Sequence, residues 1–202
     1  MRRILGEEVA EAFRLTLSPS ETQAGLHSIQ TAPWRPVILG TNQGARQMAV
    51  HEEILEEFRQ FAKTAATVTS LMEHISHALH DQMARYNWVG FYEVDPNDSG
   101  MLVCGPYAGS FTPNIRIPLN IGLCGTAAST GQTVVVDDVS KDPRYLAGSS
   151  MVKSEIVVPI FANKELAAEL DVESYFTSTF TPAEQTFVQA CAAVVERYIA
   201  GA

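Results

Sequence analysis

The feature that most constrains the fold is a change of hydrophobic period at Tyr86. Before this residue, apolar side chains recur every three or four positions over residues 46–65 and 67–86, the spacing of amphipathic helices. After it, the chain breaks into short β-type runs separated by turn residues. A last helical segment covers residues 182–200. Helices on both sides of a set of mostly antiparallel strands predict an α+β fold. We expect the helices over residues 46–65 and 182–200 to pack together on one sheet face, and the loop 137–154 to cover the other.

Turn chemistry divides the β region into six runs. Residues 95–100 carry Asp, Pro, Asn and Gly, which is typical of a tight hairpin turn, and Asn163 and Lys164 form a second turn. The last helix is expected to begin with Thr181 as its cap and Pro182 at its first position. The predicted strands are residues 88–94, 101–107, 115–117, 133–136, 155–161 and 166–172.

The first 45 residues differ in composition from the rest. Residues 7–17 have the apolar spacing of a short amphipathic helix, whereas residues 18–44 are rich in Ser, Thr, Pro, Gln and Gly. A connection this long is uncommon inside one compact domain. We therefore predict an N-terminal helix and Pro/Ser-rich linker over residues 1–45, followed by a domain over residues 46–202.

The charge balance restricts the classes of partner. Fourteen Lys and Arg stand against 23 Asp and Glu, a net charge of −9, whereas nucleic-acid-binding domains present a basic face. No apolar run approaches the roughly 18 residues of a membrane span. The chain turns acidic before a signal-peptide core can form, and its three cysteines suit a reducing compartment better than a disulfide scaffold. We expect a cytoplasmic protein with no nucleic-acid or membrane partner.

Three acids alternate along one predicted strand. Glu169, Asp171 and Glu173 project from the same face, and the residues between them face the core. Glu155 opens the strand that is expected to pair with this one. Two interpretations follow. The acids form a solvated outer face, or they line a pocket that holds a cationic ammonium group or supplies a protonated acid.

Cys124 lies at the start of a short predicted helix that Gly131 ends. A helix N-terminus lowers the pKa of a thiol, so one interpretation is a reactive thiolate. The other is a small buried side chain, the ordinary role of a free cysteine. Cys104 and Cys191 are expected in the core.

The histidines do not predict a metal site. His74, His77 and His80 share one predicted helix, on the face opposite its apolar stripe. A metal pair there would need a third ligand and a shielded cleft. We expect no metal and, because no phosphate-binding loop is present, no cofactor.

Six motifs occur in a recognisable order over about residues 50–200. They are NWVGFY from residue 87, GPY from 105, IRIP from 115, GLCGTA from 122, SEIVVP from 154 and LDVES from 170. Together they resemble the GAF domains of the free methionine-(R)-sulfoxide reductases. The resemblance implies a GAF-like six-stranded antiparallel sheet flanked by helices. It also implies a homodimer that associates through helices.

The resemblance also implies a ligand site. In that family the pocket binds free methionine sulfoxide, and Trp88 and Tyr92 match the aromatic residues that wall it. Glu155, Asp171 and Glu173 match its acids, with Glu173 where an Asp is usual. We therefore expect these five side chains to line one cavity, and at least one carboxyl group there to have a raised pKa.

The cysteines depart from the family pattern. Asn114 and Gly148 stand where the first and third family cysteines are expected, and Cys124 matches the second. The third attacks the sulfoxide sulfur and is regenerated through a disulfide. We therefore expect a module that binds a small polar ligand, a free amino acid or its sulfoxide, with the catalytic thiol lost.

Two alternatives stay open. The first is an active reductase that uses Cys124, with Cys104 as the second thiol and thioredoxin as the reductant. The second is a GAF module for a cyclic nucleotide or a chromophore. The acidic pocket disfavours a phosphate ligand, and no attachment Cys followed by His is present.

Overall fold

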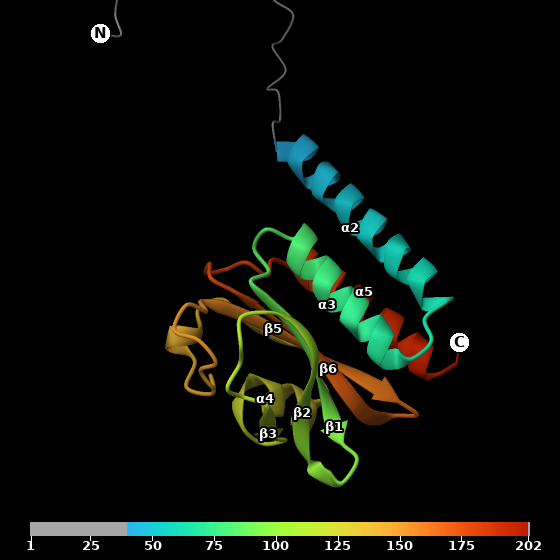
Figure 1. Ribbon diagram of the computed structural model, residues 1–202. Coiled ribbons are helices and arrows are strands. Elements are labelled where there is room, and N and C mark those ends of the chain that lie inside the picture. Colours follow the sequence, from blue (N-terminus) through green and yellow to red (C-terminus); the bar gives the residue numbers. More distant parts are fainter. Residues whose placement is uncertain (1–39, 202) are drawn as a thin grey trace, which may run out of the picture. The chain divides into compact units, whose positions relative to one another are not determined.

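The computed structural model describes residues 40–201 (Figure 1). In chain order its elements are α2 (Gly40–Ala62), α3 (Val68–Gln82), β1 (Trp88–Asp95), β2 (Asp98–Gly109), β3 (Arg116–Pro118), α4 (Gly122–Thr130), β4 (Val134–Val136), the 3-10 turn η1 (Val139–Lys141), β5 (Ser154–Ala162), β6 (Glu165–Ser174) and α5 (Pro182–Ile199). The helix predicted over residues 7–17 lies outside the described residues, as does the predicted linker up to residue 39.

The six strands form one antiparallel sheet in the order β3-β2-β1-β6-β5-β4. At its centre β1 pairs with β6, with Trp88 opposite Glu173 and Tyr92 opposite Glu169. Glu155 of β5 faces Glu173 from the other side. This register confirms the predicted α+β fold with a six-stranded antiparallel sheet. It also places the predicted aromatic and acidic residues on neighbouring strands.

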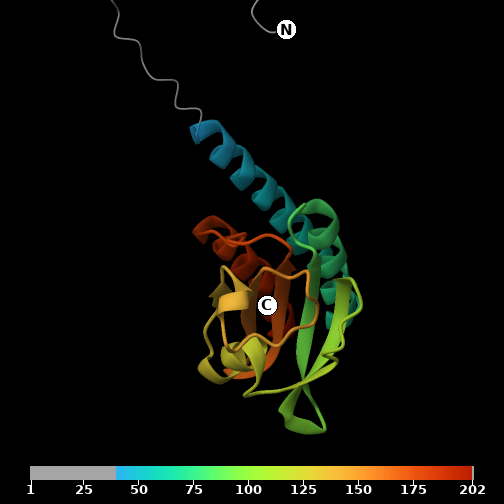
Figure 2. The ribbon, with the colours of Figure 1, turned by 90° about the vertical axis from the view of Figure 1, so that its left-hand side faces the viewer.

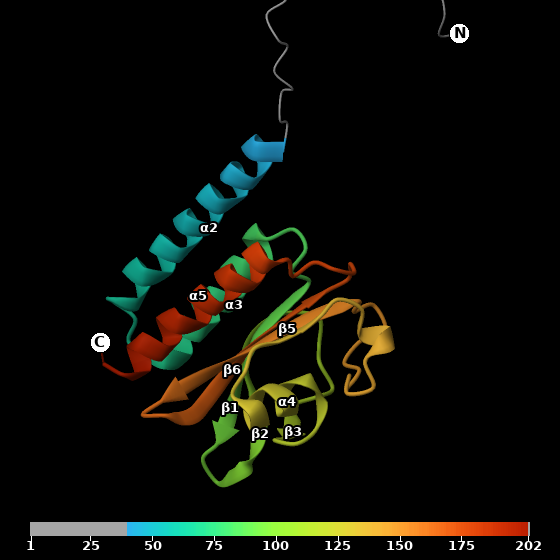
Figure 3. The same cartoon turned by 180° about the vertical axis from the view of Figure 1, so that it is seen from behind.

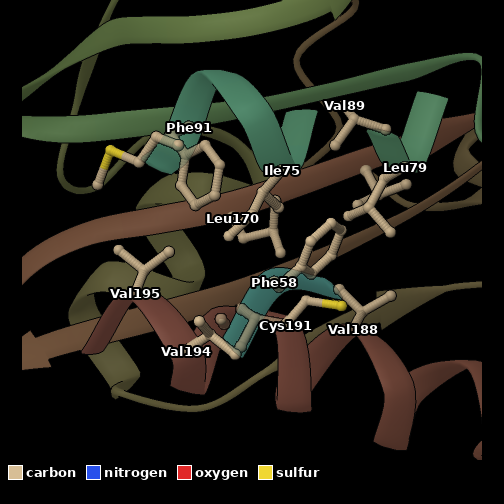
Figure 4. Close-up of a cluster of buried hydrophobic side chains, with 14 of the residues drawn as sticks. Phe58, Ile75, Leu79, Val89, Phe91, Leu170, Val188, Cys191, Val194 and Val195 are labelled. Atoms are coloured by element: carbon tan, nitrogen blue, oxygen red, sulfur yellow. The ribbon is translucent and has the colours of Figure 1, made fainter. Parts of the chain in front are cut away.

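Helices α3 and α5 cover one face of the sheet (Figures 1 and 3). The core between them contains Ile75 of α3, Phe91 of β1, Leu170 of β6 and Cys191 of α5, all fully buried (Figure 4). Burying each large apolar side chain stabilises the fold by about 1.5–3 kcal/mol. The alternation of β6 therefore places Leu170 in the core, as predicted.

Helix α2 differs from its prediction in both position and start. The sequence predicted that residues 46–65 would pack beside α5 on the sheet, but α3 takes that place, and α2 packs on the outer side of α3 and α5 (Figures 1 and 3). Its narrow apolar stripe, which includes Ile54 and Phe58, joins the same core. The helix begins at Gly40, before the predicted start at 46, because extending an existing helix costs little once its nucleus has formed.

A buried carboxylate joins α2 to α5. Thr181 caps α5 by accepting a hydrogen bond from the backbone N–H of Glu184. The Glu184 carboxylate in turn accepts hydrogen bonds from the Gln47 amide and the Tyr86 hydroxyl. The predicted Thr181 cap is therefore present. The residue that it caps, Glu184, also contacts α2 through its side chain.

The opposite face of the sheet carries α4 and the chain that runs from β4 to β5 (Figure 2). A second core lies there and includes Leu102 of β2, Leu123 of α4, Val139 of η1 and Val152. The segment 137–154 thus covers this face, as predicted. Among residues 40–201, no helix is both long enough and apolar enough to cross a membrane.

The turn of the β5–β6 hairpin consists of two residues whose backbone lies in the left-handed region of φ/ψ space. Asn163 has φ 52° and Lys164 has φ 73°. Positive φ at both central residues is the geometry of a type I′ turn, whose twist matches that of the flanking strands. Asn tolerates this conformation, whereas a lysine there is strained.

Candidate functional site

A small cavity lies on the α4 face of the sheet. Its volume is about 20 Å³, enough for about one water molecule. Its walls come from β1, β3, β5 and β6, from α4, and from two connecting segments. The lining residues are Tyr92, Asn114, Ile117, Gly122, Leu123, Cys124, Leu146, Glu155, Asp171 and Glu173.

The predicted acids meet at this cavity. Glu155 and Asp171 are only 5% and 4% exposed, and Glu169 beside them on β6 is fully buried. Within the described part of the chain, neither oxygen of Glu169 has a hydrogen-bond partner, and the same holds for Oδ1 of Asp171. Within residues 40–201, no Lys, Arg or His forms an ion pair with these acids or with Glu173. Burying a carboxylate without a partner costs free energy.

Burial changes the ionisation of these acids. It raises the pKa of Glu155, Glu169 and Asp171 well above the usual range, and repulsion between the acids acts in the same direction. Burial raises the pKa of Glu173 to about 7. The raised pKa expected from the sequence is therefore present. The cavity holds carboxyl groups that donate as well as accept hydrogen bonds near neutral pH.

Cys124 lies in the first turn of α4 and is buried. Its Sγ donates to Oδ2 of Asp171 at 3.8 Å. Burial, and then the charge of Asp171, raise the pKa of the thiol well above its usual value. This agrees with the second of the two interpretations, a small buried side chain, because burial and the neighbouring acids outweigh the effect of the helix N-terminus on the thiol. Cys104 is half-buried rather than in the core, and burial raises its pKa to about 11.

The two predicted aromatic residues differ in position. Tyr92 lines the cavity, and its hydroxyl donates to the backbone carbonyl of Asn114 at 2.9 Å. Trp88 does not line it. Its indole packs between Tyr92 and Tyr107, with ring centroids 6.1 and 5.5 Å away. Gly90 leaves room for this ring, because a β-carbon there would overlap the indole and lie 2.7 Å from Cβ of Tyr107.

Leu146 is a wall of the cavity that the sequence did not indicate. It lies in the segment between η1 and β5, and its carbonyl accepts a hydrogen bond from Nδ2 of Asn114 at 3.3 Å. Gly148 follows in the same segment. A β-carbon there would lie 3.7 Å from Oε1 of Glu173. The position expected to carry the family nucleophile therefore adjoins the acids.

The histidines of α3 lie away from this cavity. His74 was expected on a solvent-facing surface. Instead its ring stacks on Phe61, with the ring centroids 4.0 Å apart, and its Nε2 lies 2.9 Å from Oε1 of Glu57 of α2. The packing of α2 over α3 explains the difference, because the sequence did not predict that contact.

Comparison with known proteins identifies the domain. A family model described as "GAF domain" matches residues 49–199. The chain belongs to the GAF domain family. The match includes all six strands and every residue that lines the cavity.

The relatives of this GAF domain include enzymes. The free methionine-R-sulfoxide reductase of Saccharomyces cerevisiae is 33% identical over 124 residues, which cover 61% of this chain and 68% of that protein. The Neisseria meningitidis free methionine-R-sulfoxide reductase, solved in complex with its substrate, is 31% identical with a TM-score of 0.71, over 76% of this chain and 90% of that one. The fRMsr of Staphylococcus aureus, also solved with substrate, is 28% identical with a TM-score of 0.68, over 74% and 95%. The GAF domain is thus related to the free methionine-R-sulfoxide reductases.

Proposed function

We propose that this GAF domain binds a free amino acid, methionine or its sulfoxide, without reducing it. The observation that carries the proposal is the cavity in which Glu155, Asp171 and Glu173 converge, with no cationic side chain of residues 40–201 paired to them. The ammonium group of an amino acid supplies the missing positive charge. Tyr92 supplies an aromatic wall for the side chain of the ligand.

The cavity is smaller than the proposed ligand, which sets a condition for binding. A volume of about 20 Å³ is too small for an amino acid. Binding therefore requires the lining to move, and the proposal is that Leu146, in the connecting segment between η1 and β5, moves outward with that segment. That movement breaks the hydrogen bond from Asn114 to the Leu146 carbonyl, at a net cost of about 0.5–1.5 kcal/mol.

The proposed loss of catalysis rests on the thiols. In sulfoxide reduction a thiolate attacks the sulfur, methionine leaves, and the thiol becomes a sulfenic acid. A second thiol then condenses with it, releasing water and forming a disulfide that an external dithiol reduces. Asn114 and Gly148 stand where two of these thiols are expected. Cys124 and Cys104 both have raised pKa values, so neither is an activated nucleophile.

Calorimetric titration of the full chain tests the binding. We expect heat from L-methionine and from both epimers of its sulfoxide. The N-acetyl sulfoxide, which lacks the ammonium group, should bind at least about tenfold more weakly. Asp171→Asn should weaken binding similarly, whereas Glu165→Gln, an exposed acid of the same strand, should leave it unchanged. If no free amino acid binds at millimolar concentration, the proposal is wrong.

The alternative function is sulfoxide reduction by Cys124 with Cys104. The observation that favours it is the position of Cys124 in the cavity, 3.8 Å from an acid that can donate a proton. An NADPH-linked assay with thioredoxin and methionine-(R)-sulfoxide distinguishes the two functions. Turnover that disappears in Cys124→Ser would establish the reductase.

A further inference from the structure

Three donor groups of different chemistry converge in the cavity. The Sγ of Cys124, an oxygen of Glu155 and an oxygen of Asp171 lie within 4.8 Å of one another. They come from α4, β5 and β6, and each residue is at least nine-tenths buried. Separate rigid elements thus hold one thiol and two carboxyl groups around a single point.

A second observation indicates that this group has a ligand. Asp171 lines the cavity, and its Oδ1 is buried and has no hydrogen-bond partner in the part of the chain that the structure describes. Buried polar atoms in folded proteins are nearly always paired. An acceptor left free, beside a thiol and a second acid, is the arrangement that a cation completes.

We propose that Cys124, Glu155 and Asp171 bind a divalent cation of the zinc class. One sulfur and two carboxylate oxygens suit Zn²⁺ or Co²⁺, whereas Mg²⁺ and Ca²⁺ prefer ligand sets made only of oxygen. Three protein ligands leave a fourth tetrahedral position for water or a solute. The cavity, at about 20 Å³, accommodates one ion without movement of Leu146.

Binding releases protons. The Cys124 thiol gives up its proton as the sulfur–metal bond forms, and any carboxyl group that is protonated does the same. The site differs from the absence of metal expected from the sequence, because no histidine contributes and the donors are far apart in the chain. It does not depend on the proposed function, because the ion and an amino acid are alternative occupants of one cavity.

Cobalt titration of the EDTA-treated full chain tests the site. A thiolate ligand gives Co²⁺ a sulfur-to-metal charge-transfer band in the near ultraviolet, and tetrahedral geometry gives intense visible bands. We expect one Co²⁺ per chain, with both signals, and displacement by Zn²⁺ but not by Mg²⁺ or Ca²⁺. Cys124→Ser should abolish the charge-transfer band, and Cys104→Ser, a half-buried thiol outside the donor set, should keep it.

Circular dichroism shows whether the Cys124→Ser variant folds. If it does not, a carboxylate variant provides a second test. Asp171→Asn should weaken Co²⁺ binding at least about tenfold while the charge-transfer band persists at saturation. The proposal is overturned if the wild-type chain shows no such band at millimolar Co²⁺, or if the band survives Cys124→Ser. It is also overturned if a folded Asp171→Asn variant binds as tightly as the wild type. The test uses no amino acid, so its failure leaves the proposed function untouched.

Discussion

Gly148 lies against Glu173 at the cavity. A β-carbon at position 148 would be 3.7 Å from Oε1 of Glu173 and 3.5 Å from Nδ2 of Asn114. These are ordinary van der Waals separations, and Gly148 is not among the glycines with positive φ. The backbone therefore accepts a side chain at this position. The two positions where family thiols are expected are neighbours in space.

The first prediction is that thiols at these positions create reductase activity. We expect the double variant Asn114→Cys, Gly148→Cys to reduce methionine-(R)-sulfoxide at least about tenfold faster than the wild type, with dithiothreitol as reductant, because it supplies both a nucleophile and a resolving thiol. The matched control, Asn114→Ser with Gly148→Ser, fills the same space without sulfur and should stay inactive. A folded, ligand-binding cysteine variant without turnover would contradict the prediction.

The sequence predicted the sheet and much of the cavity, because hydrophobic alternation indicated the strands and the motifs indicated the residues of the cavity. The alternation of β6 assigned Asp171 to one face and Leu170 to the other, and the structure agrees. The motif around Tyr92 located the aromatic wall. These assignments depend on local pattern, which a strand imposes on every second residue.

The remaining features depend on contacts that no local pattern records. Leu146 lies in a segment without periodicity, so only the folded chain shows that it lines the cavity. Trp88 matches a motif, yet its packing against Tyr107 keeps it off the lining. For Cys124, the sequence offered both the helix dipole and burial, and only the folded chain shows that burial outweighs the dipole. The donor set of Cys124, Glu155 and Asp171 likewise exists only after three elements meet.

The second prediction concerns the room that Gly90 leaves for Trp88. Gly90→Ala should destabilise the fold by about 1–3 kcal/mol, because the new methyl group overlaps the indole and lies 2.7 Å from Cβ of Tyr107. Urea unfolding measures the change. Gly44→Ala is the control: that glycine is exposed in α2 with no atom near its β-carbon position, and alanine there should stabilise by about 0.5–1 kcal/mol. Equal effects at the two sites would contradict the packing described for Trp88.

The third prediction concerns the strained hairpin turn. Lys164 holds φ at 73°, a conformation that costs a residue with a β-carbon about 1–2 kcal/mol. Lys164→Gly should therefore stabilise the protein, by about 1 kcal/mol or somewhat less after the extra entropy of glycine in the unfolded chain. Thermal unfolding measures the gain. Lys164→Ala removes the same charge but keeps the β-carbon, so a similar gain from alanine would show that strain is not the cause.

The last prediction tests whether Cys104 can serve as a nucleophile. Burial raises its pKa from 9.0 to about 11, with a further contribution from the charge of Asp171. Two units correspond to a roughly 100-fold smaller thiolate fraction at pH 8, so Cys104 should react with iodoacetamide about 100-fold more slowly than the same thiol in urea. A raised pKa means that the rate should climb with pH, about tenfold per unit, until the pH approaches 11. Mass spectrometry of the digested protein follows Cys104 separately from Cys124 and Cys191. A reaction that already levels off below pH 9 would mean an activated thiol, and would favour the reductase alternative over a module that only binds its ligand.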